Sequence, residues 1–357
     1  SGYAYLLLST LLISFAVPAA MAQNKKPKNV ILMIADGTGL SQISASQYYN
    51  SQPSNYERFK TIGLIKTSSA SDLITDSAAG ATAFSAGIKT YNGAIGVDND
   101  TLPVVTILED LERRAFSTGL VATSTITHAT PGSFYAHRKF RKMEMEIAED
   151  LVTSGVEFFA GGGRKFFENR EDNKNLIATL EAKGYEMQLD RLDPSQKMKK
   201  NKKYGFLLAD SGMPKILDGR GSFLYDATKL GLEKVSQNKK GFFLMVEGSQ
   251  VDWGGHNNDA DYLISELIDF DTVLGLVLDF AKKDGNTLVV VTADHETGGF
   301  TLGAENGDYN NLNPTFSTIG HSASMVPVFA YGPGSKSFAG IYENTAIHSK
   351  IKKLLKE

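Results

Sequence analysis

The sequence predicts an α/β fold, a three-layer sandwich in which helices flank a large, mostly parallel central sheet. Five short runs rich in apolar and β-branched residues have the character of buried strands, and they span residues 30–35, 119–123, 242–246, 288–293 and 326–330. Helical patterns lie between several of them, at residues 104–115, 144–154, 175–183, 261–283 and 347–357. Near-continuous apolar strands that alternate with helices are typical of parallel sheets covered on both faces.

The composition suits a globular enzyme with a sizeable core, since 42% of the 357 residues are hydrophobic and 22% are charged. Doubly wound α/β folds hold this length in one domain, so we expect a single domain over residues 23–357. A formal net charge of −3 gives no general attraction to nucleic acid or to anionic membranes. Cysteine is absent, which excludes cysteine nucleophiles and thiolate zinc sites.

Residues 1–22 have the pattern of an export signal peptide. Residues 5–17 are apolar with small residues, and Ala20-Met-Ala22 matches the small-x-small cleavage pattern before Gln23. The apolar run is short for a membrane span, although a short anchor is an alternative interpretation. We therefore expect a mature protein that begins near Gln23, is periplasmic or secreted, and has no stable membrane association after cleavage. Without disulfides, its stability must come from its core and from bound metals.

Three of the predicted strands end in acidic residues. Asp36 follows residues 30–35, Glu247 follows residues 242–246, and Asp294-His295 follows residues 288–293. In open α/β sheets, ligands bind at the carboxyl ends of the strands. One such ending carries little information, but three predict a site at this edge of the sheet.

Residues 72–84 place Ser77 at the start of an alanine-rich helix. A helix N-terminus stabilises anions through its free N–H groups and its dipole, so phosphate on or near Ser77 would be favoured. The plainer interpretation is that Asp76 or Ser77 only caps the helix. Serine becomes a good nucleophile only when a base or a metal activates it. No Gly-x-Ser-x-Gly elbow surrounds Ser77, which favours activation by a metal over a hydrolase triad.

Three segments are interpreted as loops. Residues 190–203 carry five lysines after Pro194, which could steer an anionic substrate but suit a solvated loop better. Gly161-Gly-Gly163 lacks the Lys-Ser/Thr of a P-loop, so we interpret it as a turn. The Asn- and Gly-rich residues 303–318 are interpreted as a loop that brings His321 back to the site.

Residues 246–259 hold the densest group of candidate ligands: Glu247, Asp252, His256 and Asp259, together with the only tryptophan, Trp253. Charged groups directly after a buried strand are costly unless something compensates them, and a divalent metal is the strongest local compensator. Asp252 and His256 are four residues apart, so one helical face could offer both to one ion. A solvated loop is the alternative for this segment alone.

The histidines support a metal site. His256, His295 and His321 lie in Gly-rich or acidic contexts near strand ends, and His128 follows the run at residues 119–123. His137 and His348 have no such setting, and we expect them to be structural or on the surface. Several histidines and carboxylates at converging strand ends predict a two-metal site, in which ions about 4 Å apart clamp an in-line displacement.

Five motifs closely resemble those of the alkaline phosphatases, in the same order and at similar spacing. They are Asn29-Val-Ile-Leu-Met-Ile-Ala-Asp36-Gly, Thr75-Asp-Ser77-Ala-Ala-Gly-Ala-Thr-Ala, Val246-Glu247-Gly-Ser-Gln-Val-Asp252, Thr292-Ala-Asp294-His295-Glu-Thr-Gly-Gly and His321-Ser-Ala-Ser-Met-Val-Pro-Val. The resemblance covers nearly the whole mature chain. The compact size and the pair of His128 and Trp253 are most similar to small bacterial enzymes, including cold-active marine ones.

The resemblance implies a role for each site residue. Ser77 would be the nucleophile that forms a phosphoserine, and Arg141 would bind the phosphate with its guanidinium fork. Arg138 is the nearby alternative, but Arg141 has the better spacing from His128. Two zinc ions and one magnesium ion are implied. The first zinc would be held by Asp252, His256 and His321, the second by Asp36, Asp294 and His295, and the magnesium by Asp36, Thr130 and Glu247. Imidazole and carboxylate suit zinc, and oxygen donors suit magnesium.

Asp259 then becomes a helix-start residue, and two other residues depart from the best-known enterobacterial enzyme. That enzyme has Asp and Lys where this chain has His128 and Trp253. We expect His128 to contact the magnesium shell less directly, through water. We expect Trp253, which replaces a cation near the substrate phosphate, to weaken product binding and to speed release.

The implied function is the metal-dependent hydrolysis of phosphate monoesters by a homodimer, with an alkaline optimum and release of inorganic phosphate. A phosphodiesterase or a sulfatase of the same superfamily is one alternative. Sulfatases need a modified Cys or Ser in a Cys/Ser-x-Pro-x-Arg context, and Ser77-Ala-Ala-Gly lacks both Pro and Arg. An exported zinc-binding protein without catalysis is the other alternative, and it would keep its zinc affinity but release no phosphate.

Overall fold

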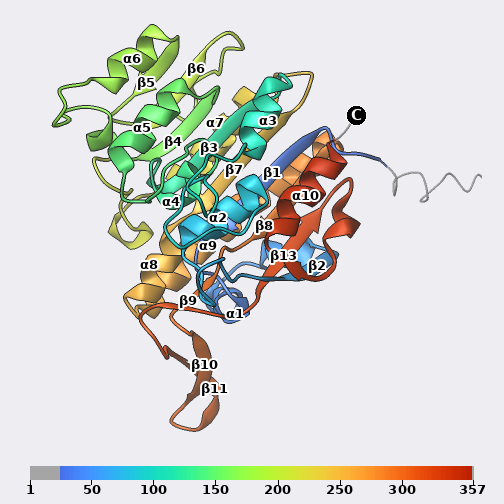
Figure 1. Cartoon of the computed structure of the whole chain (residues 1–357). Helices are drawn as coiled ribbons and strands as arrows, with labels where there is room; N and C mark the ends of the chain where they lie inside the picture. The colour runs from blue at the N-terminus through green and yellow to red at the C-terminus, as the bar shows by residue number, and fades with distance from the viewer. Residues whose placement is uncertain (1–24, 356–357) are drawn as a thin grey trace, which may run out of the picture.

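A computed structural model of the chain describes residues 25–355 (Figure 1). The predicted signal peptide at residues 1–22 lies outside the described residues. Within residues 25–355, every helix is too short or too polar to span a bilayer.

The middle layer is a ten-stranded sheet with the order β14-β2-β13-β8-β1-β7-β3-β4-β6-β5. Its strands are β1 (Asn29–Ala35), β2 (Thr61–Lys66), β3 (Ser117–Thr125), β4 (Phe158–Gly162), β5 (Tyr185–Gln188), β6 (Lys203–Leu207), β7 (Phe242–Gly248), β8 (Thr287–Thr292), β13 (Val326–Tyr331) and β14 (Gly340–Glu343). β13 runs antiparallel to its neighbours β2 and β8, whereas the other neighbouring pairs of this sheet are parallel. The predicted mostly parallel sheet is therefore confirmed.

Helices cover both faces of this sheet (Figure 1). One face packs against α2 (Ser77–Ala86), α3 (Ile107–Arg113), α5 (Glu144–Thr153), α6 (Leu176–Ala182) and α10 (Thr345–Leu354). The other face packs against α1 (Leu40–Tyr49), α7 (Phe223–Val235) and α9 (Ala260–Asp284). The arrangement is the three-layer sandwich that the sequence predicts.

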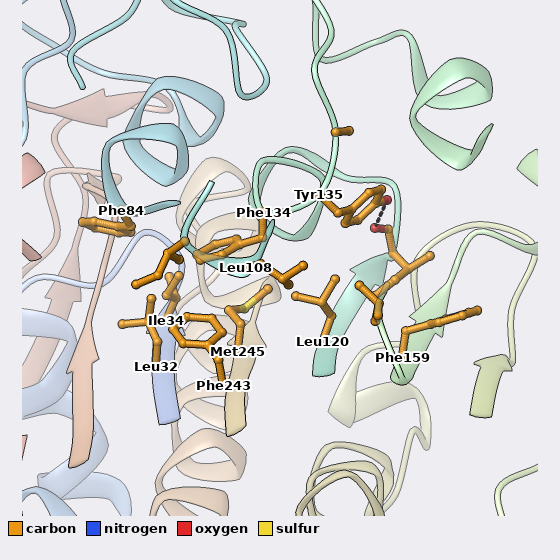
Figure 2. Close-up of a cluster of buried hydrophobic side chains, with 14 of the residues drawn as sticks. Leu32, Ile34, Phe84, Leu108, Leu120, Phe134, Tyr135, Phe159, Phe243 and Met245 are labelled. Carbon is orange, nitrogen blue, oxygen red and sulfur yellow. Dashed lines mark hydrogen bonds between the residues drawn. The ribbon is translucent and has the colours of Figure 1, made fainter. Parts of the chain in front are cut away.

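β1 shows why the sequence folds this way, because all seven of its residues are buried. Side chains alternate between the two faces of a strand. Leu32 and Ile34 accordingly pack with Phe84 and Phe243 on the α2 side, as Figure 2 shows, whereas Met33 joins the core on the α9 side. Full burial of each large apolar side chain stabilises the fold by about 1.5–3 kcal/mol. A strand that is apolar along its whole length can therefore lie only in the middle of the sandwich.

The predicted elements correspond to observed ones, with shifted ends. The five predicted strands are β1, β3, β7, β8 and β13, and the five predicted helices are α3, α5, α6, α9 and α10. α3 begins at Ile107 rather than at residue 104, because Thr106 and Glu109 form a capping box there. The strands β2, β4, β5, β6 and β14 and the helices α1 and α7 were not predicted.

The interpretation of residues 303–318 as a loop is wrong. Most of this segment lies in an exposed hairpin of β10 (Thr301–Glu305) and β11 (Asp308–Thr315), which extends away from the body of the molecule (Figure 1). Asn306 and Gly307 both have positive φ, at 49° and 79°, as a type I′ hairpin turn requires. An Asn-Gly pair between polar strands forms a hairpin without an apolar face to bury.

The contact between α10 and α2 predicts sensitivity to acid. His348 of α10 packs against Gly87, where a Cβ atom would lie 2.4 Å from the His348 Nδ1 atom. Burial and the charge of Lys352 lower the pKa of His348 to about 4. Since the unfolded value is about 6.5, the stabilisation by neutral His348 is complete above that pH and is lost as the pH falls from 6.5 through 4.

We therefore expect wild type to lose about 1–2 kcal/mol more unfolding free energy between pH 7 and pH 4 than His348→Gln, after allowance for the partial exposure of His348. Urea unfolding at a series of pH values measures this difference. Parallel pH profiles for the two proteins would contradict it.

Candidate active site

The candidate site lies where the three central strands end. β1 pairs with both β7 and β8, and its Ile34 is in register with Glu247 of β7 and with Thr292 of β8. Asp36, Glu247, Asp294 and His295 therefore reach the same edge of the sheet, and all four are fully buried. Burial, followed by the charges of Asp294, Asp252 and Glu247, raises the pKa of Asp36 well above its usual value. The cluster needs positive charge to be stable in its ionised form.

Asp36, Asp294 and His295 form one group with the geometry of a metal site, because one ligand atom from each lies within 4.8 Å of the others. His295 Nε2 is 3.2 Å from Asp294 Oδ2 and 3.4 Å from Asp36 Oδ1. Both Asp36 carboxylate oxygens and Asp294 Oδ2 are buried without a hydrogen-bond partner among the described residues. These orphaned oxygens fit a bound cation.

A second group surrounds Asp252 in α8 (Gln250–His256). Asp252, His295 and His321 also have ligand atoms within 4.8 Å of one another. His256 Nε2 is 3.3 Å from Asp252 Oδ1 and 3.1 Å from His321 Nε2, so the predicted trio of Asp252, His256 and His321 does meet. His321 reaches this edge because it precedes β13, the antiparallel strand, whose beginning lies at the carboxyl ends of its neighbours.

Backbone carbonyl groups hold the Nδ1 atoms of His256 and His321. His256 Nδ1 lies 2.6 Å from the carbonyl oxygen of Ile319, and His321 Nδ1 lies 2.8 Å from that of Thr75. Carbonyl oxygens only accept hydrogen bonds, so in the neutral imidazoles both Nδ1 atoms carry the proton and both Nε2 lone pairs face the site. Two such lone pairs 3.1 Å apart repel each other unless a cation or proton lies between them. A hydrogen bond with Asp252 raises the pKa of His256 to about 8.

A third group offers only oxygen atoms. Thr130 in α4 (Ala129–Gly132) and Glu247 each have a buried oxygen without a partner among the described residues, Thr130 Oγ1 and Glu247 Oε1. The other Glu247 oxygen accepts a 2.7 Å hydrogen bond from Ser249 Oγ. Burial raises the pKa of Glu247 to about 7, although the hydrogen bond from Ser249 lowers this pKa in part. Buried oxygens of this kind suit magnesium.

Ser77 is the first residue of α2 and is not the helix cap. Asp76 is the cap, because its Oδ1 accepts a 3.0 Å hydrogen bond from the amide of Ala79. The Ser77 hydroxyl is therefore left for the site, where its Oγ lies 3.1 Å from His295 Nε2 and the residue is almost fully buried. Ser77 thus lies at the positive end of a ten-residue helix and also contacts His295, a member of the group formed by Asp36, Asp294 and His295.

Arg141 lies beside this serine, whereas Arg138 does not. Arg141 Nη1 donates to Asp76 Oδ2 at 3.1 Å, and Nη2 lies 3.5 Å from His128 Nε2. Arg138 instead donates two hydrogen bonds, of 2.5 and 2.8 Å, to Asp150 of α5. Its guanidinium is therefore occupied away from Ser77.

His128 and Trp253 line the same side of the site as Arg141. Their rings meet edge to face, with centroids 6.0 Å apart. Burial, together with the charge of Arg141, lowers the pKa of His128 to about 3, so this imidazole is neutral. Of the other residues considered in the sequence, Asp259 caps α9 through the amide of Tyr262, and His137 pairs with Glu109 and the carbonyl of Gly96.

Two residues near the site were missed by the sequence reasoning. Thr297 donates its hydroxyl hydrogen bond to Asp252 and lies 3.2 Å from His295 Nδ1. Glu296 accepts hydrogen bonds from Gln42 Nε2, from the amide of Phe300 and from the Ser322 hydroxyl. It thereby joins β9 (Glu296–Thr297) to β12 (His321–Ser322), the two short strands that pair in this region. The position of Glu296 and Thr297 directly after Asp294-His295 was the sequence signal that could have identified them.

A family model described as alkaline phosphatase matches residues 27–313. Alkaline phosphatase 3 of Bacillus subtilis is 37% identical over 96% of this chain and 94% of that protein. A solved alkaline phosphatase from the Antarctic bacterium TAB5 is 55% identical, with a TM-score of 0.91 over 93% of this chain and 99% of that chain. A histidine variant of the TAB5 enzyme was solved with Mg bound in its M3 site.

Removal of metal is expected to make stability fall with rising pH. The pKa of Glu247 is raised to about 7 in the folded chain, against about 4.5 when unfolded, so the stabilisation by its neutral form is complete below 4.5 and is lost as the pH rises through 7. We expect the metal-free protein to lose roughly 2–3 kcal/mol of unfolding free energy over this range through Glu247.

Denaturant unfolding of chelated, dialysed protein at pH 5–8 measures this loss. Glu247→Gln should flatten the profile, and added zinc and magnesium should restore stability to wild type at pH 8. A metal-free wild type that is as stable at pH 8 as at pH 5 would show that the carboxylate cluster needs no cation.

Proposed function

The chain belongs to the alkaline phosphatase family, and we propose that it hydrolyses phosphate monoesters through a phosphoserine on Ser77, with two zinc ions and one magnesium ion and with an alkaline optimum. Membership of this family makes the protein a phosphatase. The observation that carries the proposal is the buried Ser77 Oγ at the start of α2, 3.1 Å from His295 Nε2.

The donor atoms support the proposed metals. Asp252, His256 and His321 would hold one zinc ion, and Asp36, Asp294 and His295 the other. Asp36, Thr130 and Glu247 would hold magnesium, for which an oxygen-only donor set is suited. When bound, the ions would lower the pKa of the serine hydroxyl and of water and would neutralise the negative charge of the phosphoryl group.

The residues of the chain would position both halves of the reaction. The Arg141 guanidinium would bind two phosphoryl oxygens, and the N-terminus of α2 would favour the dianion beside it. Ser77 Oγ would lose its proton and form a bond to phosphorus while the bond to the alcohol oxygen breaks in line. Water would then attack the phosphoserine, and Ser77 Oγ would regain a proton as phosphate leaves. Because the transition state is loose, the catalysis would rest on positioning and charge stabilisation.

The residues around Arg141 would set the rate at which the phosphate product is released. His128 is neutral and Trp253 carries no charge, so Arg141 would be the cation of the chain nearest the bound phosphate on this side. Trp253 would therefore weaken phosphate binding and speed release. We also propose that the active protein is an exported homodimer, periplasmic or secreted, that acts on small phosphate monoesters.

The first test removes the proposed nucleophile. We expect Ser77→Ala to lower kcat for p-nitrophenyl phosphate by at least about 10³-fold, because no hydroxyl remains to form the covalent intermediate. Acid-quenched wild type incubated with labelled substrate should carry phosphate on Ser77.

Ser85→Ala is the matched control, because Ser85 is also buried in α2 but donates to the carbonyl of Ser133. It should keep activity within a few-fold of wild type. Wild-type activity in Ser77→Ala with zinc and magnesium restored would sink the mechanism, and faster turnover of diesters than of monoesters would favour a phosphodiesterase.

A second test separates the two arginines. Arg141→Ala should lower kcat/KM by about 10²-fold and weaken inhibition by phosphate, because it removes a charged donor from the phosphoryl oxygens. Arg138→Ala should lower thermal stability, since Asp150 loses its charged partner, with little change in phosphate inhibition. Steady-state kinetics with a phosphate inhibition series and thermal melts compare the two, and the reverse pattern would assign the phosphate to Arg138.

A further inference from the structure

Residues 211–220 form a segment that lies against Trp253, and we propose that Gly212 within it is a positioning residue that sets the indole of Trp253 and, through it, the Arg141 side of the phosphate site. The kinetic part of this inference rests on the proposed function, whereas the contact between Gly212 and Trp253 does not.

The backbone on both sides of Gly212 is fixed. The carbonyl oxygen of Ser211 accepts a 2.9 Å hydrogen bond from the amide of Gly163, at the end of β4. Met213 donates its amide to the carbonyl of Thr123 in β3 at 3.0 Å, and its own carbonyl accepts a 2.7 Å hydrogen bond from Gln250 Nε2. The segment is thus attached to β3, to the end of β4 and to α8, the helix that carries Trp253.

The far end of the segment is held by a buried ion pair. The Arg220 guanidinium is fully buried and pairs with Glu266 of α9 at 2.5 Å and with Asp269 at 2.9 Å. Glu266 also accepts a 2.9 Å hydrogen bond from the amide of Ile216, and Arg220 donates to the carbonyl of Pro214. The segment therefore cannot move outward without breaking a buried charge pair, which is costly.

Gly212 touches the indole so closely that no side chain fits. A Cβ atom at this position would lie 2.6 Å from Trp253 Cη2 and 3.1 Å from Cζ3. Carbon atoms pack at about 3.5–4.0 Å, so either the segment or the indole would have to move. The segment is attached on both sides of Gly212, and the indole is only half-buried. We therefore expect the indole of Trp253, rather than the segment, to move.

Movement of the indole reaches Arg141 through one intermediate ring. Trp253 packs edge to face on His128, and His128 Nε2 lies 3.5 Å from Arg141 Nη2. Arg141 in turn contacts Asp76, the cap of the helix that begins with Ser77. A methyl group at residue 212 should therefore disturb phosphate binding although it touches no substrate.

The single tryptophan makes the first measurement direct, because all indole emission comes from Trp253. We expect Gly212→Ala to shift the emission maximum to longer wavelength, as the indole is pushed toward solvent. We also expect the inhibition constant for inorganic phosphate to rise and kcat/KM to fall by about 10- to 100-fold, the usual effect of a misplacement near 1 Å. Leu217→Ala, at an exposed position of the same segment, should change neither quantity.

A double variant tests the contact itself. Trp253→Phe lacks the outer ring that carries Cη2 and Cζ3, so Gly212→Ala in this background should change the phosphate inhibition constant by less than about twofold, a nearly complete loss of coupling. If Gly212→Ala alone does not fold, recovery of folded protein in the Trp253→Phe background supports the contact, and failure to recover overturns it.

Folded Gly212→Ala with wild-type emission and wild-type phosphate inhibition would also overturn the proposal, as would an equal loss of affinity in both backgrounds. If Ser77→Ala were to disprove the phosphoserine mechanism, the emission shift would still decide whether Gly212 positions the indole. The two failures are therefore distinguishable.

Discussion

The concentration of negative charge at the ends of β1, β7 and β8 is the constraint on which the rest of the structure depends. Asp36, Glu247 and Asp294 are fully buried, and the charges of Asp294 and Glu247 add to burial in raising the pKa of Asp36, so a compensating cation would stabilise the ionised cluster at this edge. The surrounding structure keeps these oxygens fixed where a cation can reach them. Strand register brings them to one level, and backbone carbonyls orient the histidines that face them. Rigidity here comes from the apolar strands, which have no other place to lie than the middle of the sandwich.

Each acidic residue of the cluster directly follows an apolar run in the sequence, and this local signal explains why so much of the cluster could be predicted. An apolar run in the sequence indicates a buried strand. A carboxylate directly after that run lies at the end of the strand, as Asp36 and Asp294 do. The resemblance to a family added Arg141 and Thr130, which no pattern in the chain could have placed. The structure brings all of these residues to one region, and it shows Asp76, rather than Ser77, to be the cap of α2.

What could not be predicted depends on contacts between distant segments or on weak local patterns. The edge strand β5 has four residues, three of them only partly buried, so it lacks the apolar run that marks β1. The pairing of Arg220 with Glu266 joins residues 46 apart and depends on how residues 211–220 pack against α9. The roles of Thr297 and Glu296 depend on the pairing of β9 with β12, two strands of two residues each. The hairpin at residues 301–315 could have been predicted, because the Asn306-Gly307 pair is typical of a two-residue hairpin turn. The segment was interpreted as a loop because it is rich in Asn and Gly.

That hairpin has a consequence for how this site can diversify. It joins His295 to His321, yet both ends of the excursion are held at its base by the β9–β12 pairing and by Glu296. The chain between the two histidines can therefore lengthen or shorten at the exposed tip without displacing either imidazole, because exposed tips are where insertions cost least. The positions of His295 and His321 are therefore tightly constrained, whereas the tip of the adjoining β10–β11 hairpin can vary. New surface, and with it new substrate preference or assembly, can arise beside an unchanged reaction centre.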